Sequence, residues 1–423
     1  MPVDVALTDL TGQFSRIVTE SGVAFPRRAV ALAVSGGGDS IAMMHMAARM
    51  ISPEMLHVVS VDHGLRSGAA TEIAVVRDQA AQLGLAHHVL HWTWDKTGNL
   101  QAAARHGRWQ AIARWAKGAG IDAVFLGHTE DDQVETLLMR LARGSGVDGL
   151  TAMNQTAMRD GLQIVRPLLG MTRAHLRAWL KDQNIRWCDD PSNEDRRFDR
   201  VRARQMYTQL EALGMTRKRL LQTVDHMQAA HRSLQKSAFD FARRHVRQDA
   251  GDLIFDPEGV ILDKDDTPRR VMAAAFSWMA GQTYRPRFDS LMARVDQVRK
   301  GQKVTLSGCI LLPQPGGGAR LVREAAATPV VIAGQSPDAG VQWDRRWYLE
   351  GPMTPGLRFA ALGDGLRQCT DWRRLDIPQS SLMASPAVWR DGALLAAPVA
   401  GLSNGWSAQI VTDFHSAAFG IED

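Results

Sequence analysis

Six residues near the N-terminus, Ser-Gly-Gly-Gly-Asp-Ser at positions 35–40, combine the residue types that bind a phosphate group. An apolar run at 29–34 precedes them and predicts a buried parallel strand, and residues 41–50 have helix-forming composition. Glycines let the backbone approach a ligand closely, and free amide groups at a helix start favour an anion. We therefore expect the amides and hydroxyls of this loop to hold phosphates, through Ser35, Gly36, Gly37, Gly38 and Ser40.

Two common phosphate loops do not fit this spacing. A Walker loop ends in Gly-Lys-Ser/Thr, whereas this stretch has no lysine and carries Asp39 where a cation would be wanted. A dinucleotide fingerprint starting at Gly36 requires a third glycine where Ile41 stands. The stretch instead resembles the SGGxDS signature of the ATP pyrophosphatase superfamily, whose members cleave ATP to AMP and pyrophosphate while adenylating a substrate. A Gly-rich turn without a ligand is the alternative.

A second polar group consists of His128, Asp132 and Glu135. If a helix starts near Thr129, these three side chains project toward one side, because residues three and four apart are helical neighbours. Acidic residues in a first turn also stabilise a helix through its dipole, so a purely structural role is the alternative. The His-x-x-x-Asp-x-x-Glu spacing matches no reliable zinc or iron pattern. A carboxylate pair that faces an ammonium group is the better interpretation.

Alternating strand and helix patterns position both groups. Strands are predicted at 29–34, 56–61, 87–92 and 123–126, with helices at 41–50, 71–83 and 99–117 between them. This order predicts an α/β fold with a doubly wound parallel sheet and helices on both faces. Ligands bind such sheets at the carboxyl ends of the strands, where the 35–40 loop, Asp62 and His128 all fall. We expect the three loops to converge there.

The remainder of the chain predicts two further domains. A short strand at 164–169 and a helix at 172–183 with Thr172 as its N-cap complete the first domain, 1–212. Apolar residues at helical spacing from 216 to 247 indicate a long amphipathic helix or an antiparallel pair. Helices at 268–280 and 286–300 and a hairpin at 303–312 follow. We therefore expect a helical domain at 213–330 and a small α+β or β-rich domain at 331–423.

Composition is that of a globular protein, with 45% hydrophobic and 22% charged residues among 423. No apolar run approaches the roughly 20 residues of a membrane span, and no secretory signal is visible, so we expect a cytoplasmic protein without a membrane partner. The three cysteines are far apart, which argues against disulfides, structural zinc and an iron-sulfur cluster.

Positive charge is concentrated in one segment. Residues 196–250 contain 13 Lys and Arg against 5 Asp and Glu, although the whole chain has a net charge of only +5. Such a segment attracts a polyanion, and nucleic acid is the leading candidate. A solvated helical face is the alternative.

Six blocks in order carry a resemblance to a specific family. They are SGGGDS, VDHGLR, GHxxDDxxET, RLARGSG, RPLL and WxxDPSN, all within the first 200 residues or so. Together they resemble the tRNA(Ile)-lysidine synthetases. The family usually has an arginine-asparagine pair after the aromatic that follows the last block, whereas here Phe198, Asp199 and Arg200 run into Val201.

The resemblance implies a reaction. Lysine would be joined to the wobble cytidine of an isoleucine tRNA with a CAU anticodon, in two steps. Adenylation of the cytosine carbonyl oxygen would release pyrophosphate, and the ε-amino group of lysine would then attack the same ring carbon and expel AMP. The partners implied are ATP, L-lysine and that tRNA. A monomer and a homodimer are both left open.

The resemblance also implies roles for named residues. The 35–40 loop and Asp62 would bind ATP, with Asp39 on Mg²⁺. His128 would contact the α-phosphate or assist proton transfer, since an unperturbed histidine titrates near neutrality. Asp132 would act in catalysis and, with Glu135, bind lysine. The tRNA would be held by Arg105 and Arg108 and by the basic run that begins at Arg196, within which Arg200, Arg202 and Arg204 are the candidates.

Two other interpretations remain open. One is another ATP pyrophosphatase-type RNA-modifying enzyme, although the absence of a CxxC pair disfavours thiolation and no amidotransferase domain is recognisable. The other is an RNA-binding protein that kept the nucleotide fold without chemistry. The intact set of Asp39, His128, Asp132 and Glu135 argues against it.

Overall fold

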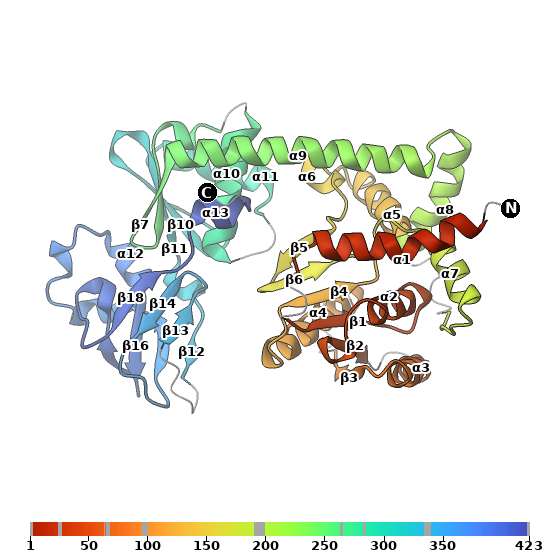
Figure 1. Cartoon of the computed structure of the whole chain (residues 1–423). Coiled ribbons are helices and arrows are strands. Elements are labelled where there is room, and N and C mark those ends of the chain that lie inside the picture. The colour runs from red at the N-terminus through yellow and green to blue at the C-terminus, as the bar shows by residue number, and fades with distance from the viewer. Residues whose placement is uncertain are drawn as a thin grey trace. The chain divides into compact units, whose positions relative to one another are not determined.

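The computed structural model describes residues 3–23, 28–62, 64, 68–94, 100–189, 199–262, 265–281, 285–333 and 340–420. Two compact units divide the chain, Met1–His231 and Arg232–Asp423. The boundary between them falls within one helix, α9 (Arg217–His245). Figure 1 labels the elements, and each unit is described here by itself.

A six-stranded sheet organises the first unit, in the order β3-β2-β1-β4-β6-β5. The pairs from β3 to β6 are parallel, and only the β5–β6 pair at one edge is antiparallel. The predicted α/β fold with a doubly wound parallel sheet is confirmed. The strands are β1 (Val30–Ala33), β2 (Leu56–Asp62), β3 (Ala86–His91), β4 (Ala123–Leu126), β5 (Thr156–Arg159) and β6 (Leu162–Val165).

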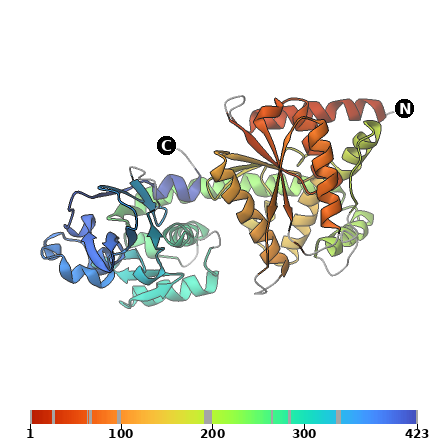
Figure 2. The ribbon, with the colours of Figure 1, turned by 90° about the horizontal axis from the view of Figure 1, so that it is seen from below.

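Helices cover both faces of this sheet (Figure 2). Successive strand residues point to opposite faces, so Leu32 and Phe125 join a core with α1, α2, α3 and α7. Ala31 and Val124 join a second core with α4 on the other face. The helices are α1 (Val3–Glu20), α2 (Gly38–Ala48), α3 (Ala69–Gln82), α4 (Leu100–Gly118) and α7 (Arg173–Asp182).

A separate hydrophobic cluster joins the remaining helices of the first unit. It contains Val134 and Leu138 of α5, Ala203 of α8, and Leu220 and Val224 at the start of α9. This packing brings the basic segment of α8 against the helix that carries Asp132 and Glu135. The elements are α5 (Glu130–Leu141), α6 (Val147–Leu150) and α8 (Asp199–Ala212).

The second unit begins with helices packed on an antiparallel sheet. One core holds α10, α11 and the end of α9 together with a five-stranded sheet of order β7-β8-β11-β10-β9. We expected a helical domain here with one hairpin, so most of this sheet was not foreseen. Its members are α10 (Asp266–Ala280), α11 (Phe288–Arg299), β7 (Val246–Asp249), β8 (Asp252–Phe255), β9 (Val304–Leu306), β10 (Cys309–Pro313) and β11 (Ala319–Arg323).

The C-terminal part of the second unit is rich in short antiparallel strands, as predicted. It contains a four-stranded sheet, β12-β15-β16-β17, and a three-stranded sheet, β13-β14-β18. Trp343 and Phe359, both fully buried, lie in the core shared by these sheets. The elements are β12 (Val331–Ile332), β13 (Gly340–Trp343), β14 (Trp347–Glu350), β15 (Arg358–Ala361), α12 (Gln379–Ala384), β16 (Pro386–Arg390), β17 (Ala393–Ala396), β18 (Ser407–Ile410) and α13 (Phe414–Phe419).

Two predictions concern the whole chain. In the described ranges, no helix combines the length and the apolar character that crossing a bilayer requires. The division into domains at 212 and 330 stays a prediction.

Candidate active site

Three loops meet at the carboxyl ends of neighbouring strands. β1 lies between β2 and β4, so the 34–37 loop, Asp62 and the Gly127-His128 pair share one rim of the sheet. Gly127 packs directly on the first loop, since a Cβ atom at this glycine would lie 3.2 Å from the backbone N and Cα of Ser40. The convergence expected from the sequence is therefore present.

The Ser-Gly-Gly-Gly-Asp-Ser loop is braced by its own hydroxyls. The Ser40 hydroxyl donates to the Gly37 carbonyl at 2.9 Å and accepts from the Ser35 amide at 3.2 Å. Gly36 has φ of +92°, which a residue with a side chain rarely adopts. No side chain caps the start of α2 in the described structure, so the amides of its first turn are open to an anion.

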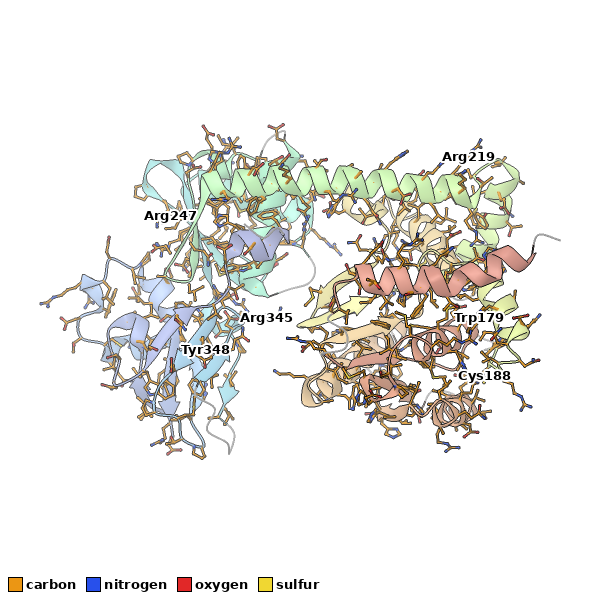
Figure 3. The ribbon with its side chains drawn as sticks, viewed as in Figure 1. Trp179, Cys188, Arg219, Arg247, Arg345 and Tyr348 are labelled. Carbon is orange, nitrogen blue, oxygen red and sulfur yellow. The ribbon has the colours of Figure 1, made fainter. Side chains whose placement is uncertain are left out.

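A backbone bridge connects this loop to the segment after α7. The Cys188 amide donates to the Gly36 carbonyl at 2.9 Å, and Gly37 forms a parallel β-bridge with Cys188. Trp187 lies against Gly38, where an added Cβ would be 3.4 Å from its ring. Figure 3 labels Cys188 in this part of the unit. The rest of the predicted WxxDPSN loop, residues 190–193, and the basic pair at 196 and 197 lie outside the described residues.

An arginine that the sequence did not single out forms the centre of the acidic group. Arg173 is the first residue of α7, and its guanidinium donates to three carboxylates: Asp39 Oδ2 at 3.2 Å, Asp132 Oδ1 at 2.7 Å and Glu135 Oε1 at 2.7 Å. Its amide donates to Asp131 Oδ2 at 2.8 Å. Arg173 therefore connects the phosphate loop to both carboxylates that the resemblance assigns to lysine.

Asp132 has both of its oxygens engaged. Oδ2 accepts from the Thr129 amide at 2.8 Å and from the Thr129 hydroxyl at 2.9 Å, completing a capping box at the start of α5. Oδ1 accepts from Arg173 and also from Arg200 at 3.3 Å. Although burial raises the pKa of Asp132, these two guanidiniums hold it below the ordinary value. The capping role that was the structural alternative is thus combined with ion pairing.

Among the described residues, only one of the two Glu135 carboxylate oxygens has a hydrogen-bond partner. Its Oε1 accepts from Arg173 and from Arg204 at 2.9 Å. Its Oε2 is buried and has no hydrogen-bond partner among the described residues. A buried carboxylate oxygen without a donor is unfavourable, so this atom is suited to a ligand that carries an ammonium group.

Asp39 is the carboxylate nearest the phosphate loop. Burial raises its pKa to about 6, and the guanidinium of Arg173 opposes that rise. In the described parts of the chain, no group of three or more His, Cys, Asp or Glu side chains is arranged to hold a metal. A single carboxylate still fits Mg²⁺, which is commonly held by one or two carboxylates together with substrate phosphates.

His128 is a neutral histidine in a positively charged environment. Burial lowers its pKa to about 4; Asp132 opposes this, while Arg166, Arg200 and Arg105 lower it further. The pKa of His128 therefore lies below that of an unperturbed histidine. The Nδ1 atom of His128 is buried and has no partner among the described residues.

The arginines predicted to bind tRNA occupy different environments. Arg200 and Arg204 contact the buried carboxylates, whereas Arg202 is exposed and pairs with Asp199. Arg105 and Arg108 are exposed on α4, and the charge of Arg105 reaches His128. Their contact with tRNA stays a prediction.

Two other predicted features have simpler environments. Asp62 accepts from the Gly64 amide at 2.9 Å at the end of β2. Val201, which stands where the family usually has asparagine, is buried in α8.

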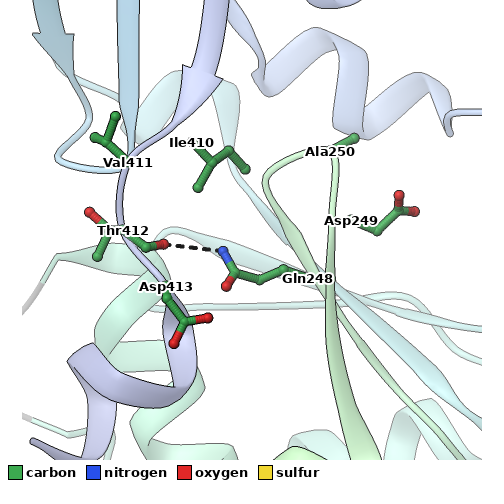
Figure 4. Close-up of a pocket in the computed structure, with 7 residues that line it drawn as sticks. All are labelled: Gln248, Asp249, Ala250, Ile410, Val411, Thr412 and Asp413. Atoms are coloured by element: carbon green, nitrogen blue, oxygen red, sulfur yellow. Dashed lines mark hydrogen bonds between the residues drawn. The ribbon is translucent and has the colours of Figure 1, made fainter. Parts of the chain in front are cut away.

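A hollow in the second unit lacks comparable chemistry. It lies between the β7–β8 turn and the segment from β18 to α13, where the Gln248 side-chain amide donates to the Thr412 carbonyl at 3.2 Å (Figure 4). Asp249 and Asp413 are its ionisable lining groups. No residue of the six sequence blocks reaches it, so the candidate active site is the rim of the first sheet.

Comparisons with known proteins agree with this location. Residues 7–211 match the family model described as a PP-loop domain. The chain is 43% identical over 399 residues to the tRNA(Ile)-lysidine synthase of Ruegeria pomeroyi, covering 93% of this chain and 94% of that protein. It is 46% identical over 231 residues to the enzyme of that name from Bradyrhizobium diazoefficiens, covering 52% and 64%. It is 30% identical over 341 residues to the tRNA(Ile)-lysidine synthase of Anaplasma marginale, covering 76% of this chain and 70% of that protein.

Proposed function

Because the chain belongs to the tRNA(Ile)-lysidine synthase family, we propose that it ligates L-lysine to the wobble cytidine of an isoleucine tRNA with a CAU anticodon, at the cost of ATP. The product, lysidine, would change the codon read from AUG to AUA. The observation that carries the proposal is the direct contact of Arg173 with Asp39 of the phosphate loop and with Asp132 and Glu135. This contact supports a nucleotide site next to a site for a cationic substrate.

The first step needs an activated leaving group. The cytosine carbonyl oxygen attacks the α-phosphorus of ATP, and the bond to the bridging oxygen breaks with its electron pair on pyrophosphate. The open amides at the start of α2 stabilise the departing charge. Mg²⁺ would supply further charge neutralisation, and Asp39 would hold it.

The second step needs a positioned amine. The ε-nitrogen of lysine attacks the activated ring carbon, the carbon–oxygen bond breaks, AMP leaves, and the nitrogen loses its proton. Glu135 Oε2 is the acceptor for an ammonium group of lysine, since Oε1 is already bonded to Arg173 and Arg204. His128 is neutral at physiological pH, and its lowered pKa favours contact with the α-phosphate over proton transfer, the two roles that the resemblance implies.

The tRNA would be bound electrostatically. In the part of α9 that belongs to the second unit, exposed cations recur on one helical face, at Arg232, Lys236 and Arg243. They supply a sequence-independent attraction for phosphates that weakens with salt. A cytoplasmic location and the oligomeric state, homodimer included, stay predictions.

The decisive experiment is ATP-dependent incorporation of labelled lysine into an unmodified isoleucine tRNA transcript with a CAU anticodon. Elongator methionine tRNA, which shares the anticodon, is the control. We expect incorporation into the isoleucine transcript alone, and loss of it in Asp39→Asn. ATP consumption with another nucleophile, and no lysine in the product, would instead indicate a different RNA-modifying enzyme.

The lysine site has its own test in Glu135→Gln. Loss of a charge-assisted hydrogen bond costs about 1.5–3 kcal/mol, so KM for lysine should rise about 10- to 100-fold while KM for ATP changes little. Glu130→Gln is the matched control, because Glu130 lies on the same helix and pairs with Arg217 at 3.7 Å. An unchanged KM for lysine in Glu135→Gln would remove Glu135 from the lysine site.

A further inference from the structure

Arg166 belongs to the RPLL block, which has no role in the reaction derived so far. It follows β6 immediately, and β6 is the parallel neighbour of β4, with Val165 opposite Phe125. β4 in turn leads into Gly127 and His128. Arg166 therefore lies on the same rim as the phosphate loop.

The guanidinium of Arg166 has no counter-charge among the described residues. Its Nη1 donates to the Asn154 carbonyl at 2.6 Å, and its Nε is buried without a partner in the described structure. No carboxylate of the described residues lies within ion-pair distance of it. Burial and the nearby charge of Arg105 lower the pKa of Arg166 to about 10. Arg173, by contrast, contacts three carboxylates.

His128 faces the same region. The charges of Arg166, Arg200 and Arg105 all act on its ring, whose Nδ1 is buried and unpartnered among the described atoms. The carboxylate that acts on His128 is Asp132, which Arg173 and Arg200 already engage. Half-buried cations and an unpaired ring nitrogen beside a phosphate loop would be stabilised by a bound anion.

We propose that Arg166 binds the phosphate of the adenylyl group beside His128, first as the α-phosphate of ATP and then as the phosphate that links AMP to cytidine. The assignment rests on the proposed function. Gly127 packs on Ser40, which places His128 next to the start of α2. The α-phosphate is the group whose charge persists through both steps, so a fixed cation there stabilises both transition states.

The test uses the full chain and three variants. Arg166→Gln removes the charge, Arg166→Lys keeps it without the planar fork, and Arg159→Gln is the matched control on the neighbouring strand β5. Arg159 has its own carboxylate partner, Asp160, at 3.7 Å. Calorimetric titrations with ATP, AMP and adenosine, without tRNA or lysine, compare a ligand that has the α-phosphate with one that lacks it.

We expect Arg166→Gln to lower the affinity for ATP and AMP about tenfold or more, which corresponds to loss of a charge-assisted hydrogen bond. The affinity for adenosine should not change. Arg166→Lys should lower the affinity for ATP and AMP by less, and Arg159→Gln should not change it. If Arg166→Gln does not fold, the contrast between AMP and adenosine in Arg166→Lys carries the test.

Two results would overturn the proposal. Equal losses for AMP and adenosine would mean that Arg166 only supports the nucleoside pocket. Unchanged affinity of Arg166→Gln for ATP and AMP would remove Arg166 from the α-phosphate site. Because nucleotide affinity is read without tRNA or lysine, failure of this proposal is distinguishable from failure of the proposed ligation.

Discussion

Replacing Arg173 by methionine should unfold the first unit at a markedly lower temperature. The change leaves Asp132 and Glu135, only 4% and 3% exposed, without a guanidinium that each contacts at 2.7 Å. Breaking one partner of a buried pair costs about 3–5 kcal/mol. Arg200 and Arg204 remain on these carboxylates, so we take the lower limit, about 3 kcal/mol. At about 2–4 °C per kcal/mol for a unit of this size, Tm should fall by about 6–12 °C.

The matched control lies one turn further along the same helix. Arg177 pairs with Asp189 at 2.7 Å, but both side chains are exposed, at 48% and 66%, and exposed pairs contribute about 0–1 kcal/mol. Arg177→Met should therefore change Tm by less than about 4 °C. Differential scanning calorimetry of both variants measures the contrast. Equal shifts, or an Arg173→Met shift below about 2 °C, would refute the view that Arg173 neutralises this cluster.

Two further predictions concern the same unit. The folded pKa of His128 is about 4, below the unfolded value, so the unfolded chain binds its proton more tightly and stability is lost as pH falls from 6.5 toward 4. In urea unfolding, His128 should make the free energy of unfolding about 2 kcal/mol smaller at pH 5 than at pH 7. His128→Gln should remove this difference, whereas His175→Gln, at an exposed histidine, should keep it. An equal dependence of stability on pH in the wild type and in His128→Gln would contradict the prediction. Gly107→Ala should destabilise the unit by about 1–3 kcal/mol through overpacking, because the new Cβ would lie 1.9 Å from Trp92 Nε1. Gly118→Ala is the control, since its Cβ would have nothing within 4 Å, and it should be neutral or stabilising in thermal melts. Equal changes in Tm for the two variants would mean that Trp92 moves aside.

The central part of the fold could be predicted because local patterns and tertiary packing agree there. The apolar run at 29–34 is buried as β1, and the Gly-rich turn leads into α2. The β5–β6 hairpin was missed, although Asp160 and Gly161, both at positive φ, form a strong hairpin signal. Whether residues 216–247 form one helix or two depends on packing that periodicity does not encode, and the structure has the single helix α9.

The candidate site was partly predictable for a similar reason. The phosphate loop and the His128, Asp132 and Glu135 spacing are short-range patterns, visible within ten residues. Arg173 lies 134 residues from Asp39 and 41 from Asp132, so only the folded sheet brings them together. Its one local signal is its place directly after the N-cap Thr172, which the sequence did indicate. The lowered pKa of His128 likewise follows from burial and distant arginines.

The double engagement of Asp132 constrains how its variants can be interpreted. One oxygen fixes the start of α5 and the other neutralises guanidiniums, so a single substitution is pleiotropic. Asn at this position has a single acceptor oxygen, which can replace either the contact with Thr129 or the contact with Arg173 but not both. Loss of activity in Asp132→Asn therefore cannot by itself identify a lysine ligand. A genetic screen would find this position intolerant of substitution whether the reaction requires the capped start of α5 or the neutralised guanidiniums.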